Sequence, residues 1–371
     1  MIGCLRAAER GGKVKSVARK VLKALATLVI LGSSVVLFNY LRYIVFWFPT
    51  ESVAFESDGV EIRGTLVKPS DEGTFPAVVI LHGSGPESMR EPSYHIIANT
   101  IVRSGMAVLL YDKRGVGQSG GDFDSSLYRD FVADAVSAVR YLARRDDIDA
   151  DNIGLQGNSE GGWLAPEVAY RTGQVAFIFN RAGPPLSWVE NVIWEVRNDA
   201  IAVGVAEADV GMIEAITRKR WDYYIAAAKD PSLGSGPLRD AISAEMKHVR
   251  ETVPGARDAL PASLAPFDAE TYAADATIYS YDPRPFLEAI DIPMMYTFGE
   301  TDINVPTARS VAYLETFRRE FDKDIDIVVF KGVGHPMANW TGILTAGYVP
   351  EFLDVLGSWC AEHVSGQPAH D

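Results

Sequence analysis

The fold of this chain is decided by residues 153–162, which read Ile-Gly-Leu-Gln-Gly-Asn-Ser-Glu-Gly-Gly. The first four residues have the mainly apolar character of a buried strand, and residues 160–171 have the composition of a helix. Between them lies the pattern G-x-S-x-G. A strand that turns sharply into a helix at such a serine presents the hydroxyl at the edge of a sheet. The stretch predicts an α/β fold with Ser159 as a nucleophile; the alternative is an exposed serine in an ordinary turn.

The same stretch predicts how a negative charge near Ser159 is stabilised. Side chains in place of the motif's glycines would collide with neighbouring backbone in so tight a turn. A helix that begins at Glu160 points its first N–H groups toward the serine. A second donor is expected in the loop after an early strand, where residues 82–86 read His-Gly-Ser-Gly-Pro. We predict the backbone N–H groups of Ser84 and Glu160 as an oxyanion hole; the alternative for the loop is a plain glycine-rich turn.

A nucleophilic serine needs a base, and the chain contains six histidines. His335 lies in a glycine-rich loop just after the last predicted strand. The carboxyl ends of parallel strands are where the sites of open α/β folds gather. His82 ends an early strand and is better placed to orient that loop. His248 lies in a later insertion, and His363 and His370 lie at or beyond the last helix, so His335 is the predicted base.

The acid that orients the histidine is expected at a strand end between Ser159 and His335. Residues 299–302, Gly-Glu-Thr-Asp, follow a predicted strand at the right place in the chain. Asp302 is preferred to Glu300 because a residue directly at a strand end more often braces the loop. The predicted catalytic triad is Ser159, Asp302 and His335, with no metal and no cofactor.

From residue 53 onward the chain alternates short strands with amphipathic helices. Such alternation implies parallel pairing through right-handed crossovers. The predicted fold class is α/β, with a mostly parallel, doubly wound sheet. The predicted strands are 60–67, 77–81, 107–111, 152–156, 175–179, 293–298 and 325–330, and the predicted helices are 93–103, 127–142, 160–171, 307–319 and 349–363.

One long segment breaks this alternation. Residues 186–285 look mainly helical and contain no strand run. An insertion of about 100 residues between two parts of one sheet predicts a helical cap. Its aromatic residues either line an acyl or aromatic pocket or form the core of the cap; they are Trp188, Trp194, Trp221, Tyr223 and Tyr224. The last residues, 365–371, are predicted to be a frayed tail.

The charge of the chain is divided unevenly. Residues 1–49 contain eight basic residues and one acidic residue, so they carry +7 within a net charge of −14 and leave −21 on the remainder. An acidic body does not suit nucleic acid, whose binding depends on Lys and Arg that neutralise phosphates. Cys4 and Cys360 stand at opposite ends of the chain, which argues against a disulfide, and no Cys/His spacing resembles a zinc site.

Residues 24–41 form an uncharged run of 18 mostly aliphatic residues. At a rise of 1.5 Å per residue, such a helix nearly crosses a hydrocarbon core of about 30 Å. Seven basic residues precede it, and Tyr43, Phe46, Trp47 and Phe48 after it suit an interfacial aromatic belt. The positive-inside rule predicts a cytoplasmic N-terminus and an extracytoplasmic body, on the periplasmic or outer face.

Two other interpretations of this apolar segment are open. A cleaved signal peptide is disfavoured because bulky aromatic residues follow the run and no A-x-A pattern marks a cut. A buried core helix leaves the basic leader without a role. The predicted organisation is a basic leader and transmembrane anchor at 1–49, ended by Pro49, and one α/β domain at 50–371 that contains the cap at 186–285.

Taken together, these motifs resemble those of the α/β-hydrolase superfamily. Within it, the chain is similar to bacterial esterases related to dienelactone hydrolases and to prolyl-oligopeptidase-type peptidases. The resemblance covers residues 53–190 and 285–363, implies a cofactor-free triad at Ser159, Asp302 and His335, and leaves substrate choice open. It is carried by His82-Gly83, by Asp-Lys-Arg-Gly-Val-Gly-Gln-Ser at 112–119, by the elbow at 157–162, by Gly-Glu-Thr-Asp at 299–302 and by Gly334-His335.

The predicted function is hydrolysis of a small or medium-sized carboxylic ester through an acyl-enzyme on Ser159. Three alternatives are open: a lipid acyl hydrolase or acyltransferase at the membrane, an aminopeptidase-like serine peptidase of S9 type, and a catalytically silent protein that binds ligands in the same pocket. The expected partners are a small acyl ester and the membrane, with no nucleic acid. The oligomeric state is left open.

Overall fold

The computed structural model describes residues 2–339, 341–342 and 345–364, so the tail predicted at 365–371 lies outside it. Its centre is one eight-stranded sheet with the order β1-β2-β4-β3-β5-β6-β7-β8. The strands from β3 onward pair in parallel, which confirms the predicted mostly parallel sheet. The strands are β1 (Thr50–Ser57), β2 (Val60–Val67), β3 (Phe75–Leu81), β4 (Ala107–Tyr111), β5 (Ile148–Asn158), β6 (Val175–Arg181), β7 (Met294–Gly299) and β8 (Ile325–Phe330).

The edge strand β1 is absent from the sequence prediction. It pairs antiparallel with β2 through a two-residue turn at Asp58 and Gly59, which have φ of 48° and 78°. Positive φ at both positions is the signature of a type I′ hairpin, for which Asp-Gly is a preferred pair. Val53, Phe55 and Ser57 alternate inward along β1, so the turn and this alternation together were the signal for the missing strand.

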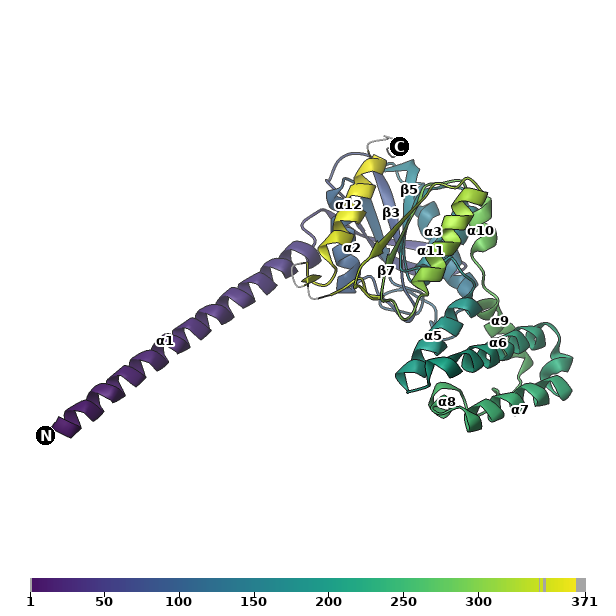
Figure 1. Cartoon of the computed structure of the whole chain (residues 1–371). Helices are drawn as coiled ribbons and strands as arrows, with labels where there is room; N and C mark the ends of the chain where they lie inside the picture. Colours follow the sequence, from purple (N-terminus) through teal and green to yellow (C-terminus); the bar gives the residue numbers. More distant parts are fainter. Residues whose placement is uncertain (1, 340, 343–344, 365–371) are drawn as a thin grey trace.

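Helices cover both faces of the sheet (Figure 1). On one face, α2 (Pro92–Arg103) packs beside α12 (Pro350–Val364) over an apolar cluster that includes Val78 and Ile80 of β3. The other face buries the alternate β3 residues, Val79 and Leu81. It is covered by α3 (Tyr128–Leu142), α4 (Glu160–Thr172), α10 (Arg284–Ala289) and α11 (Thr307–Glu320). Because both faces of β3 are buried, its sequence is a continuous apolar run.

The segment between β6 and β7 folds into a lobe of helices beside the sheet (Figure 1). The lobe has an apolar core of its own, in which Tyr223 and Tyr224 are buried and Trp221 is partly buried. These three aromatic side chains therefore belong to the core of the lobe, one of the two roles that the sequence leaves open for them. Its helices are α5 (Trp188–Ala202), α6 (Glu207–Lys229), η2 (Pro231–Gly234), α7 (Pro237–Thr252), α8 (Ala256–Ala259) and α9 (Ala269–Tyr279).

The N-terminal helix α1 (Ile2–Asn39) projects from the body and continues into a π-helical turn, η1 (Tyr40–Ile44) (Figure 1). The stretch 22–44 is long and apolar enough to cross a membrane and is almost entirely exposed. The helix ends at Ile44, before Pro49, because the chain is captured there by α2. The buried Asn99 donates to the carbonyls of Tyr43 at 2.9 Å and Val45 at 3.3 Å.

The attachment of the end of the N-terminal helix to α2 changes the role of the predicted aromatic belt. Tyr43, Phe46 and Phe48 pack partly buried against the α2–α12 side of the core, whereas Trp47 is 68% exposed. Three of the four rings therefore attach the end of the helix to the body. Trp47 is the member of the group that is free to lie at a membrane interface.

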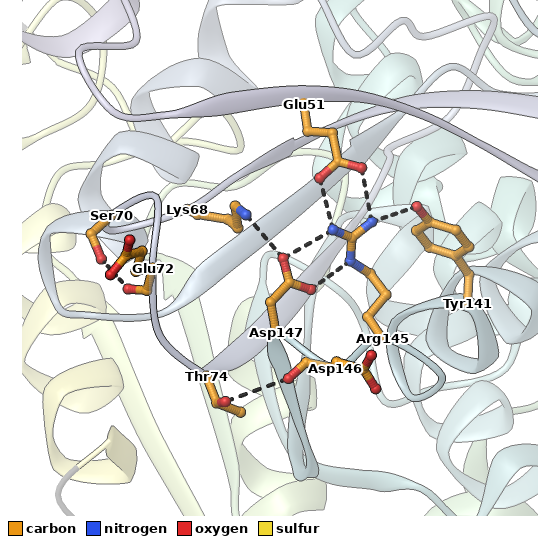
Figure 2. Close-up of polar contacts among 9 residues, drawn as sticks. All are labelled: Glu51, Lys68, Ser70, Glu72, Thr74, Tyr141, Arg145, Asp146 and Asp147. Carbon is orange, nitrogen blue, oxygen red and sulfur yellow. Dashed lines mark hydrogen bonds and ion pairs between the residues drawn. The ribbon is translucent and has the colours of Figure 1, made fainter.

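An ion-pair network ties the edge hairpin to the start of β5, the strand that leads to Ser159 (Figure 2). Arg145 makes two hydrogen bonds to Glu51 of β1, at 3.0 and 2.7 Å, and two to Asp147, at 2.8 and 2.9 Å. Lys68, just after β2, donates to the same Asp147 at 2.9 Å. Hydrogen bonds from Arg145 lower the pKa of Asp147 well below its usual value. Bidentate pairing of this kind fixes geometry, so the antiparallel edge is held to the entry of β5.

Candidate active site

Ser159 lies at the turn from β5 into α4, with φ of 50° and ψ of −110°. A positive φ is strained for a serine, and such strain persists only where the surroundings impose it. They do so here because β5 and α4 meet too closely for side chains. A Cβ on Gly157 would lie 2.7 Å from the Gly161 carbonyl oxygen, and one on Gly161 would lie 2.5 Å from that of Leu81. This turn has the strand–turn–helix geometry that the sequence predicts for a nucleophile elbow.

The three residues of the predicted triad lie in one hydrogen-bonded chain. His335 Nε2 is 3.0 Å from Ser159 Oγ, and His335 Nδ1 is 2.8 Å from Asp302 Oδ2. The Asp302 side chain is fully buried, and its Oδ1 accepts the backbone N–H groups of Asn304 at 2.8 Å and Val305 at 2.9 Å. These bonds fix the carboxylate in the position where its Oδ2 meets the imidazole.

Glu300, the other candidate for the acid, does not reach His335 in the described structure. Its Oε2 accepts the backbone N–H of Gly332 at 2.8 Å. Glu300 therefore links the loop after β7 to the loop after β8, the latter of which carries His335. This is the bracing role that its position directly at the strand end predicts.

The two predicted oxyanion donors come from two segments that meet at Ser159, the loop after β3 and the start of α4. Ser84 lines the same cavity as Ser159, and Glu160 is the first residue of α4. The neighbouring Gly83 N–H is already used, because it donates to the Tyr94 hydroxyl at 2.9 Å. Among the described residues, neither the Ser84 amide nor the Glu160 amide donates a hydrogen bond. Both amides are therefore available to a ligand.

His82 stands behind this loop rather than in the site. Its ring packs edge-on against Tyr94 and Tyr111, with centroids 5.0 and 4.8 Å away. Complete burial lowers its pKa to about 3, with a smaller contribution from Lys113, so the ring is neutral at physiological pH. It supports the loop by packing, in agreement with the orienting role predicted for it.

A cavity of about 710 Å³ opens over Ser159 and His335. Its wall combines apolar groups with charged ones. Trp163 contributes an aromatic surface, Glu87 and Arg181 contribute charges from the main domain, and Asn191 and Glu195 come from α5 of the inserted lobe. The insertion therefore contributes side chains to the site, although the aromatic residues singled out in its sequence do not line this cavity.

A family model described as X-Pro dipeptidyl-peptidase (S15 family) matches residues 58–333. The chain belongs to this family. The match runs from the β1–β2 turn through the elbow, the insertion and the loop with Asp302. The match confirms the predicted α/β-hydrolase superfamily. The predicted link to prolyl-oligopeptidase-type enzymes is consistent with it.

Individual relatives agree with this assignment. Esterase EstD of Thermotoga maritima is 25% identical over 300 residues, which cover 78% of this chain and 62% of EstD. Human dipeptidyl peptidase 8 is 27% identical over 154 residues, or 38% of this chain and 17% of that protein. An esterase structure from Pyrococcus furiosus superposes with a TM-score of 0.53 at 14% identity and covers 87% of this chain and 95% of that one. The chain thus spans less than two thirds of EstD, and the structural likeness shows the α/β-hydrolase fold.

Sequence reasoning missed three charged groups in the cavity of this S15-family chain, Glu87, Arg181 and Glu195, of which Glu195 comes from the inserted lobe. Glu195 lies on α5, and Asn191 donates to its Oε1 at 3.1 Å. Burial raises the pKa of Glu195 to about 7; the charge of His335 opposes the rise, and Asp199 and Asp302 add to it. No motif marks this residue, because only the fold of the insertion brings it to the triad.

We expect Glu195→Gln to stabilise the protein at high pH only. Below about pH 4 the carboxyl is protonated in the folded and unfolded chains, and glutamine replaces it with little change. Above pH 7 the folded wild type contains an ionised, poorly hydrated carboxylate that the variant lacks. The free energy of unfolding is expected to rise by about 1–2 kcal/mol at pH 8, discounted for partial exposure, and by less than about 0.5 kcal/mol at pH 4.

Urea unfolding of both proteins at pH 4, 6 and 8 measures this difference. Asp222→Asn, at an exposed position of α6 in the same lobe, is the matched control, and its effect is expected to stay within about 0.5 kcal/mol at each pH. An equal change for Glu195→Gln at pH 4 and pH 8 would show that its carboxyl titrates normally.

Proposed function

We propose that this chain is a serine hydrolase that cleaves carboxylic esters through an acyl-enzyme on Ser159. The single observation that carries the proposal is the hydrogen-bonded chain from Ser159 through His335 to Asp302. His335 takes the hydroxyl proton as Ser159 attacks the acyl carbonyl, and later returns it to the leaving group. Asp302 holds the imidazole tautomer and stabilises the imidazolium. Water then attacks the acyl-enzyme with His335 as base.

The amides of Ser84 and Glu160 are proposed to bind the oxyanion of each tetrahedral intermediate. Three observations support this: Ser84 lines the same cavity as Ser159, Glu160 directly follows Ser159, and neither amide donates a hydrogen bond among the described residues. Such donors act where charge develops and need no reorganisation during the reaction. A small or medium-sized acyl ester suits a cavity of about 710 Å³. The similarity to a protein named esterase over 78% of this chain supports the same substrate class.

A peptidase is the second candidate, favoured by the carboxylates in the cavity. The family description names X-Pro dipeptidyl-peptidase, an activity that acts at a free peptide N-terminus. Glu195 and Glu87 line the same cavity as Ser159 and offer negative charge to an ammonium group. An esterase for neutral esters has no need of that charge, so the two candidates differ in the charge of the preferred substrate.

A lipid ester is the third candidate, favoured by a second cavity of about 470 Å³ at the end of α1. Its wall is mainly apolar and includes Val36 and Tyr40 of the membrane-span candidate. It shares Ala346 and Gly347 with the wall of the active-site cavity. We also propose that residues 1–49 are an uncleaved anchor with a cytoplasmic N-terminus, and that residues 186–285 act as a cap over the site.

One substrate panel separates these candidates. Residues 50–371 and the full chain in vesicles are assayed on p-nitrophenyl esters from acetate to palmitate and on Ala-Pro-p-nitroanilide. Turnover of short esters supports the main proposal, whereas faster turnover of the anilide favours the peptidase. Long-chain preference that appears only in vesicles and falls with Val36→Trp, which fills the second cavity, favours the lipid enzyme. A folded protein that turns over nothing and escapes labelling by a fluorophosphonate is a binding protein.

Membrane topology is tested apart from activity. A C-terminal alkaline phosphatase fusion is active only outside the cytoplasm, so enzymatic activity of the fusion supports the proposed orientation. Retention of the leader in the isolated protein, read by mass spectrometry, separates an anchor from a cleaved signal peptide.

A further inference from the structure

Lys113 lies just after β4, and its ammonium group is buried beside the elbow, with its side chain 4% exposed. Nζ donates to the Gly83 carbonyl at 2.6 Å, to the Gly85 carbonyl at 3.1 Å and to Glu160 Oε1 at 2.9 Å. An ammonium group has three donors, and all three are used here. The two carbonyls flank Ser84, and the carboxylate belongs to the residue after the nucleophile. One cation therefore joins the two segments that carry the proposed oxyanion amides.

The hydrogen bond from Lys113 to the Gly83 carbonyl also sets the direction of the Ser84 N–H group. The Gly83 carbonyl and the Ser84 N–H belong to one peptide unit, which is planar and trans. In such a unit the C=O and N–H bonds point opposite ways. A carbonyl held toward Lys113 therefore turns the Ser84 N–H away from Lys113, toward the cavity that Ser84 and Ser159 both line.

We propose that Lys113 is a positioning residue that sets the spacing and direction of the Ser84 and Glu160 amides. This inference rests on the proposed hydrolase function. Lys113 touches neither the triad nor the cavity in the described structure, and it acts through the loop carbonyls and the Glu160 side chain. The ring of Phe131, 4.8 Å from Nζ, helps to hold the cation in place.

Stability alone does not explain this buried pair. The Lys113 and Glu160 side chains are 4% and 9% exposed, and apolar residues of similar volume often replace such a pair without loss of stability. The adjacent loop residues are engaged elsewhere. Asp112 accepts from Ser88 at 2.6 Å, and Arg114 makes a bidentate pair with Asp134. Arg114–Asp134 is a second buried ion pair, between the same loop and α3, and neither partner lines the cavity over Ser159 in the described structure.

The test uses the full chain and removes both charges together, because Lys113→Met alone leaves the Glu160 carboxylate buried and unpaired. For Lys113→Met with Glu160→Gln, we expect kcat on p-nitrophenyl butyrate to fall about 100-fold with KM changed less than about threefold, as for loss of one oxyanion donor. Affinity for a trifluoromethyl ketone, which forms an anionic tetrahedral adduct with a serine, should weaken by a similar factor. Arg114→Met with Asp134→Asn is the matched control and should keep kcat within about threefold, whatever its melting temperature.

A second variant keeps the inference testable if the double variant does not fold. Lys113→Arg retains the charge but cannot place one compact donor among three acceptors, so kcat should fall about 10-fold with KM unchanged. Wild-type kcat and inhibitor affinity in a folded Lys113 variant would overturn the positioning role while the hydrolase function stands. A wild type that hydrolyses no ester and takes up no fluorophosphonate would overturn both.

Discussion

Ser159→Ala is expected to lower kcat on p-nitrophenyl butyrate by about 10⁴- to 10⁶-fold and to leave the fold intact. The variant lacks the oxygen that attacks the carbonyl, and His335 Nε2 loses its partner at 3.0 Å. The residual rate reflects substrate binding and the oxyanion amides alone. Alanine accepts the same backbone strain as serine at φ of 50°, so stability should change little.

The measurement compares initial rates of the purified variant and wild type, with thermal unfolding as a check on the fold. Ser84→Ala is the matched control, because it removes a cavity hydroxyl and keeps the backbone N–H; its kcat should stay within about threefold. Activity of the Ser159 variant within 100-fold of wild type would place the nucleophile elsewhere.

Asp302→Asn is expected to lower kcat by about 10⁴-fold, the second largest effect. The Asp302 carboxylate accepts from His335 Nδ1 at 2.8 Å, which leaves Nε2 free to take the serine proton. An asparagine that turns its NH₂ toward Nδ1 stabilises the opposite tautomer, in which Nε2 carries the proton and is no base. It also removes the charge that stabilises the imidazolium. The backbone N–H groups of Asn304 and Val305 still have an oxygen acceptor, so the loop should fold.

Glu300→Gln is the control for Asp302→Asn. Its amide oxygen still accepts the Gly332 N–H, so kcat is expected to remain within about threefold. Rate profiles between pH 6 and 10 add a second readout, since the Asp302 variant should regain part of its activity at high pH, where hydroxide assists proton removal. A greater loss for Glu300→Gln than for Asp302→Asn would reverse the assignment of the acid.

The inserted lobe contributes to the wall of the cavity over the triad. Its helix α5 places Asn191 and Glu195 in the cavity wall, while the rest of the lobe is built around its own apolar core. The proposed triad and the inserted part of the cavity wall therefore come from different segments of the chain. The elbow, the acid and the base lie at strand ends of the sheet, where the parallel topology brings them together.

Sequence alone determined the features that depend on neighbouring residues. The elbow follows from a strand, a helix and a glycine-flanked serine within ten residues, and the parallel sheet follows from alternating periodicities. Asp302 and His335 could be predicted from the sequence because each follows a predicted strand, and the carboxyl ends of parallel strands lie at one edge of the sheet. The edge strand β1 was missed although the local signal was present at Asp58 and Gly59.

Only the tertiary structure decided the contacts between side chains far apart in the chain. Lys113 meets Glu160 across 47 residues, and Glu195 reaches the triad from an insertion without a motif. Neither contact leaves a periodic pattern in the sequence. Each depends on the order of the strands in the sheet and on how one helix packs at the sheet edge. Periodicity records which face of an element is buried, whereas it is packing that selects the partner of a buried charge.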